Sequence, residues 1–171
     1  LNRHIDHALR ELSLSCPLDT KATLSTTAGS RDLSLSSISD LVEIEAVEYP
    51  VGNYPPSYVR FSVWADTLTL LMDSLPGDSE DVYVYYGKLH TLNADSSTLP
   101  AKLEDLLALG AAAYAAMEWA SFATNRVNLG GAETWRNYLT WGQDRLAAFM
   151  KGLAKHSKKN TVRAHQLYPV S

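Results

Sequence analysis

The sequence contains very little cysteine and no long hydrophobic run. Cys16 is the only cysteine among 171 residues, so no disulfide can form within the chain. A single cysteine beside Pro17 is typical of a small core residue rather than of a nucleophile. The first twelve residues, LNRHIDHALREL, lack the apolar segment of a signal peptide. The apolar run Leu106–Met117 is shorter than the about 20 residues that a membrane-spanning helix needs, so we expect no membrane association.

Sequence signatures of catalysis are also missing. The chain has no glycine-rich phosphate loop, no serine nucleophile elbow and no CxxC motif. His4 and His7 lie three residues apart, but a metal site needs three or four ligands, and the other histidines show no ligand spacing. Glu118 lies in an apolar helix, where pairing with Arg126 or Arg136 explains a carboxylate better than a general-acid role does. We therefore expect no enzyme activity, no catalytic residue, no metal and no cofactor.

Acidic residues are absent from the end of the chain. The formal charge is −4, yet the residues from Lys151 onward carry +5 and the residues before it carry −9. The five cations are Lys151, Lys155, Lys158, Lys159 and Arg163. This asymmetry predicts a partner for the tail or charge pairing between copies of the chain. The alternative is a solvated helix end, which its dipole favours.

The hydrophobic period at the start of the chain predicts a helix over residues 1–16. Pro17 ends that helix because it has no backbone N–H to donate. The helix begins on the first residue without a capping Ser, Thr or Asp, so we expect further residues upstream of this numbering.

Between residues 21 and 92 the period changes to two and predicts an inserted antiparallel meander of four or five strands. Ala65-Asp66 is short enough to form a hairpin turn. In the strand around Ile44 we expect an alternating pattern, with Glu43 and Glu45 on the wet face. The Tyr49–Pro56 loop is too rich in Pro and Gly to be regular, and turn chemistry or an exposed contact would each explain its two tyrosines.

The segment around which the chain is organised is Leu103–Ala123, LEDLLALGAAAYAAMEWASFA. Its small residues allow neighbouring backbones to approach closely, and we expect this helix to be buried on most sides. A second long helix is expected over residues 133–159, with Gly142 and Gly152 as its weakest points. Beyond Asn160 the helical period is lost, which predicts an extended arm over residues 160–171.

Together these patterns predict an α+β fold in a single domain. It comprises a helical bundle with an inserted β-meander, a long C-terminal helix and an extended arm. The helical core covers residues 99–159. We expect the arm to be exchanged between subunits, because a monomer has little use for its apolar residues; a frayed tail is the alternative. The predicted protein-interface residues are Tyr49, Tyr54, Lys151, Lys155, Lys158, Lys159, Arg163, Leu167 and Tyr168.

Several stretches resemble the head-to-tail adaptor (connector) proteins of tailed bacteriophages. They are ALRELSLSCP, VEYPVGNYPPSYVRF, the hairpin around WADTLTLL, VYVYYGKLHTL and especially LPAKLEDLLALGAAAYAAMEWASFATNRVNLGG followed by TWRNYLTWGQDRL. The resemblance covers nearly the whole chain and consists of structural residues, with no catalytic signature. It implies a structural virion protein of the neck, assembled in the host cytoplasm into a dodecameric ring under the portal. Such a ring extends the DNA channel and docks the next neck or tail protein, and DNA passes through it without specific binding.

Two other functions are compatible with the sequence. The basic segment from Lys151 to Arg163 could bind nucleic acid, although the acidic remainder of the chain opposes this. A small hydrolase centred on Glu118 or Cys16 would need a site that the sequence does not reveal. A native mass measurement separates a ring from both alternatives.

Overall fold

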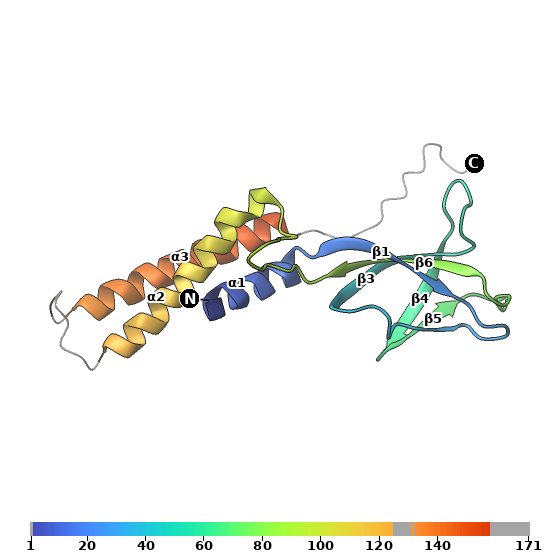
Figure 1. Ribbon diagram of the computed structural model, residues 1–171, viewed down its shortest axis with the longest axis horizontal. Helices are drawn as coiled ribbons and strands as arrows, with labels where there is room; N and C mark the ends of the chain where they lie inside the picture. The colour runs from blue at the N-terminus through green and yellow to red at the C-terminus, as the bar shows by residue number, and fades with distance from the viewer. Residues whose placement is uncertain (1, 125–130, 132, 158–171) are drawn as a thin grey trace. The chain divides into compact units, whose positions relative to one another are not determined.

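The computed structural model describes residues 2–124, 131 and 133–157, whose helices and strands are drawn in Figure 1. They form a mixed α+β fold with a curled six-stranded antiparallel sheet and three helices, the last of which is C-terminal. The contacts divide them into a helical unit, residues 2–18 and 89–157, and a sheet unit, residues 19–88. The predicted arm, residues 160–171, lies outside the described residues.

The helical unit contains α1 (Asn2–Ser15), a 3₁₀ turn η1 (Ala101–Leu103), α2 (Glu104–Ala123) and α3 (Thr134–His156). The sheet unit contains β1 (Leu18–Ser25), β2 (Asp32–Ser34), β3 (Leu41–Glu48), β4 (Tyr58–Trp64), β5 (Thr67–Leu71) and β6 (Asp81–Lys88). The strand order is β1-β6-β3-β4-β5-β2.

The sheet is a meander only from β3 to β5. The predicted hairpin is confirmed, because Trp64 pairs with Thr67 around Ala65-Asp66. The prediction of a simple meander is wrong beyond it, since β6 pairs with β3 rather than with β5. The edge of β5 that does not pair with β4 pairs with β2, where Leu33 lies opposite Leu68.

Strand β3 does not keep the alternation that its sequence predicts. Its register against β6 shifts between residues 41 and 43 and again between residues 44 and 46. Such bulges change the face on which the following side chains lie. Val47, which the alternation placed on the face of Glu43 and Glu45, is therefore fully buried, and Glu48 beside it is 5% exposed.

Hydrogen bonds fix the turn that leads into β6. The Thr26 hydroxyl donates to the Gly77 carbonyl at 2.8 Å and accepts from the Glu80 amide at 3.0 Å. The Glu80 carboxylate accepts from the Gly77 amide and from the hydroxyl of Tyr49. These bonds join β1, the end of β3 and the 77–80 turn beside one apolar core. The fully buried core residues here are Val47, Leu68, Leu70, Val82 and Val84.

In the helical unit, α2 contacts both α1 and α3, and Figure 1 shows α2 and α3 side by side. A Cβ on Gly110 would lie 2.8 Å from the ring of Phe149, and one on Gly142 would lie 2.8 Å from Met117 Cγ. A Cβ on Gly152 would meet Leu106. The expected weak points of α3 are therefore close-packing positions, and the helix runs through both glycines without a break.

The expectation that α2 is buried on most sides is wrong for its second half. Its small residues are covered, including Ala113, Ala116 and Ala120. Trp119 and Phe122 remain 41% and 59% exposed. By length and composition alone, Ala101–Ala123 could cross a membrane. The contacts of its small residues with the neighbouring helices explain that composition without one.

Candidate interaction surface

A groove with an almost entirely apolar lining lies between α2 and α3. Ala115, Ala116 and Trp119 of α2 and Asn137, Tyr138 and Trp141 of α3 line it, and its volume is about 470 Å³. We call it the aromatic groove. The Trp119 and Tyr138 rings pack against each other in its lining, with 4.4 Å between their centroids. Trp and Tyr are the residues that most often dominate binding energy at protein interfaces.

The helical repeat explains why the groove forms here. Positions 112, 115, 119 and 122 of α2 are spaced by three and four residues, so their side chains share one stripe. The stripe begins with alanines and ends with Trp119 and Phe122. The small alanine side chains therefore leave a hollow on the helix surface, beside which the aromatic rings project. Tyr138 and Trp141 form the facing stripe of α3 and are each 44% exposed.

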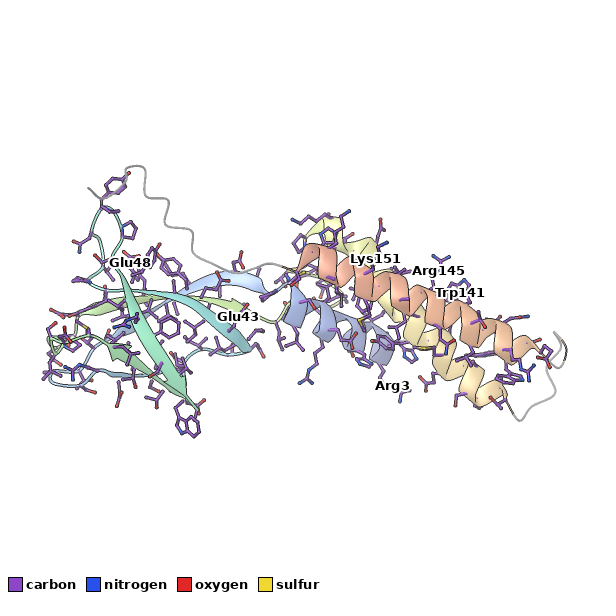
Figure 2. All side chains as sticks on the ribbon, turned by 180° about the vertical axis from the view of Figure 1, so that it is seen from behind. Arg3, Glu43, Glu48, Trp141, Arg145 and Lys151 are labelled. Carbon is purple, nitrogen blue, oxygen red and sulfur yellow. The ribbon has the colours of Figure 1, made fainter. Side chains whose placement is uncertain are left out.

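Exposed cations follow the aromatic groove further along α3. The guanidinium of Arg145 lies 5.2 Å from the ring of Trp141. Lys151 and Lys155 follow in the next turns and are exposed, as was expected for a basic helix end. Figure 2 shows Trp141, Arg145 and Lys151 in succession along the helix. With Arg136 and the single acid Asp144, α3 carries a formal charge of +3.

Glu118 pairs with α1 rather than with Arg126 or Arg136, the partners that the sequence predicted. Its carboxylate accepts from the Arg3 guanidinium and lies 2.8 Å from His4 Nε2. The hydrogen bond from Arg3 lowers the pKa of Glu118. Arg136 pairs with Glu133 at 2.7 Å, and Arg126 lies outside the described residues. The Glu118 side chain is 48% exposed, and an exposed, ion-paired carboxylate has no feature of a general acid.

A second polar contact joins the same two helices one turn along. The imidazole of His7 stacks on the Tyr114 ring, with 4.2 Å between their centroids. The Tyr114 hydroxyl donates to the Glu11 carboxylate. Burial and that hydrogen bond raise the pKa of Tyr114. These contacts attach α1 to the side of α2, and α1 contributes no residue to the lining of the aromatic groove.

His90 and Cys16 are buried within the helical unit, and His90 is hydrogen-bonded there. His90 Nε2 lies 3.1 Å from the Cys16 carbonyl, and Nδ1 lies 3.2 Å from the Thr98 hydroxyl. Nδ1 also lies 3.1 Å from the Thr98 carbonyl, so both ring nitrogens have hydrogen-bond partners within this unit. The Ser13 hydroxyl accepts from the His90 amide at 3.0 Å. The Cys16 side chain is 5% exposed, which fits the small core residue that the sequence predicts.

The predicted contact loop presents only one of its two tyrosines. Tyr54 is 98% exposed, whereas Tyr49 is 7% exposed and bonded to Glu80 in the sheet core. Tyr49 is thus a core residue in this structure rather than a surface one. Lys158, Lys159, Arg163, Leu167 and Tyr168 lie outside the described residues. Among residues 2–124, 131 and 133–157, no group of three His, Cys, Asp or Glu side chains could hold a metal ion.

The aromatic groove was not predicted from the sequence, and neither Trp119 nor Trp141 was singled out as a surface residue. The signal is present in the sequence as a second apolar stripe, displaced from the core positions 139, 142, 146, 149 and 153. No model of a protein family and no curated protein sequence matches this chain.

Proposed function

We propose that the chain is a structural virion protein, a head-to-tail adaptor that forms a dodecameric ring beneath the portal of a tailed phage. In this role it lies in the neck, extends the DNA channel and docks the next neck or tail protein. The helical units would form a bundle around the ring, with the meander inserted and the arm extended. The sequence resemblance suggests the family. The structural observation that carries the proposal is the exposed aromatic groove on a closely packed helix pair.

An interaction surface explains the aromatic groove better than a catalytic site does. Its lining offers almost no polar groups and no carboxylate, and Glu118 on the same helix α2 is bonded to α1. Chemistry needs convergent polar groups, whereas a protein interface needs rigid aromatic residues with a polar rim. Trp119, Tyr138 and Trp141 fit the second requirement, and Arg145 lies on the rim.

The charge distribution suits a channel protein. Residues 19–88 contain eleven acidic and four basic residues, a formal charge of −7. Like charge repels the phosphates of DNA, so an acidic lining lets DNA pass without binding it. The basic segment from Lys151 and the loop carrying Tyr54 supply further contacts to the portal or to the next neck component.

Particle assembly with and without this chain tests the function. We expect particles that lack the chain to accumulate heads separate from tails, and electron microscopy of complete particles to show the chain in the neck. Heads joined to tails in its absence would refute the adaptor function. Deletion of residues 160–171 tests the arm, and association with the portal that is unchanged by light scattering would reject it as an anchor.

The alternative is a nucleic-acid-binding module, favoured by the exposed Arg145, Lys151 and Lys155 along one helix. Binding through these cations would weaken steeply as salt is raised, because each neutralised phosphate releases counterions. Retention on DNA at low salt that is lost in the double variant Lys151→Gln/Lys155→Gln would support this module. DNA retention absent at low salt would exclude it.

A further inference from the structure

We propose that the aromatic groove of one copy receives the β4–β5 hairpin tip of a second copy, with Trp64 as the inserted side chain. This inference rests on the proposed function, because it assigns the contact that would join neighbouring subunits of the ring. It concerns a heterologous contact, in which two different surfaces of the same chain meet.

Trp64 is placed for insertion. It is the last residue of β4 and is 84% exposed, although Trp is usually well covered in a folded domain. Its backbone is held by pairing with Thr67 across a two-residue turn. A residue fixed on a hairpin loses little conformational entropy when it binds, which favours its use as an anchor.

The aromatic groove matches this side chain in size and chemistry. Its volume of about 470 Å³ is enough for one large aromatic side chain together with part of the turn. Ala115 and Ala116 provide a low floor, and Trp119, Tyr138 and Trp141 provide ring faces against which an indole can pack.

Charge complementarity points to a second copy as the occupant. Asp66 lies two residues from Trp64 and is exposed at the same turn. Arg145 lies on the rim of the aromatic groove, 5.2 Å from the Trp141 ring. With these two residues included, the sheet unit carries −7 and α3 carries +3, so the charges of the two surfaces attract each other.

Trp64 is favoured over Tyr54, the other exposed aromatic tip. Tyr54 lies in the loop between β3 and β4, outside the paired backbone, and the loop residues 49–57 contain no charged side chain. That loop therefore offers nothing to pair with Arg145. Tyr54→Ala is accordingly the matched control for Trp64→Ala, since each substitution removes one exposed aromatic residue from the sheet unit.

Each copy carries one hairpin tip and one aromatic groove. A variant that lacks the tip can therefore still bind the tip of a variant that lacks the groove. Trp64→Ala removes the tip and keeps the groove, whereas Ala115→Arg fills the groove floor and keeps the tip. Arg is a good helix former, so α2 tolerates the second change. Sedimentation velocity up to about 1 mM protein detects even weak association. Circular dichroism checks that each variant is folded.

We expect the unaltered chain and Tyr54→Ala to associate, and each of the two interface variants to lose at least about 30-fold in affinity. A one-to-one mixture of the two variants restores one contact per pair, so we expect heterodimers that do not grow further. An unaltered chain that stays monomeric, association unchanged by Trp64→Ala, or a mixture that stays monomeric would each overturn the proposal.

The two proposals fail separately. Heterodimers in the mixture, together with heads that join tails without this chain, would retain the contact and reject the adaptor function. Unjoined heads and tails, together with a mixture that stays monomeric, would retain the function and reject this contact.

Discussion

Replacing Gly110 by Ala tests how closely α2 and α3 pack. In an uncrowded helix this change stabilises by about 1 kcal/mol, because Ala restricts the unfolded backbone and favours the helix. In this protein the new methyl carbon would lie 2.8 to 3.0 Å from three atoms of the Phe149 ring. Phe149 is fully buried, so the ring has little room to move.

Overpacking of this kind costs about 1–3 kcal/mol. Set against the gain in helix propensity, it leaves Gly110→Ala destabilising by about 1 kcal/mol. Ala108→Gly is the control, because Ala108 is exposed on the same helix two residues away. The stability of that variant should change through helix propensity alone, with a loss of about 1 kcal/mol.

The double variant Gly110→Ala/Phe149→Leu identifies the cause. Phe149→Leu alone leaves a space and should cost on the order of 1–2 kcal/mol. The methyl group introduced at position 110 then occupies part of that space, so the two changes together should cost at least about 1 kcal/mol less than their sum. Urea unfolding followed by the helical circular dichroism band measures the free energy of unfolding of the unaltered chain and of the four variants. A Gly110→Ala variant that gains about 1 kcal/mol, or additive effects, would refute the close approach.

Two further predictions concern ionisable pairs. The hydrogen bond to Glu48 raises the pKa of Tyr85 to about 12, and spectrophotometric titration should show this tyrosine ionising later than an ordinary one. The hydrogen bond contributes fully to stability below the unfolded pKa of tyrosine, about 10, and this contribution is lost as pH rises toward 12. Tyr85→Phe should cost about 1–2 kcal/mol of stability at neutral pH. The variant should also lack the loss of stability between pH 10 and 12. An unchanged alkaline unfolding profile would contradict this assignment. Glu118→Gln should weaken the contact between α1 and α2 and lower the unfolding temperature. This difference in unfolding temperature from the unaltered chain should vanish as pH falls through the lowered pKa of Glu118. Thermal unfolding compared at neutral and acidic pH checks it, and a difference that persists in acid would refute it.

Local patterns were enough to predict most elements. The α+β class, the β4–β5 hairpin and the alternation of Val82 and Val84 against Tyr83 all follow from a period of two and short turns. The small-residue character of α2 also predicted close packing, which the approach of Gly110 to Phe149 bears out. These features depend on neighbours within a few residues, and such neighbours are visible in sequence.

Tertiary structure alone decided the rest. The pairing of β6 with β3, the burial of Glu48 after two bulges and the partner of Glu118 each depend on residues 30 or more positions away. The aromatic groove is of the same kind, because an apolar stripe on a helix does not reveal whether another helix will cover it. Sequence determined which faces are apolar. Only the packing of α1 and α3 around α2 decided which of those faces was left open.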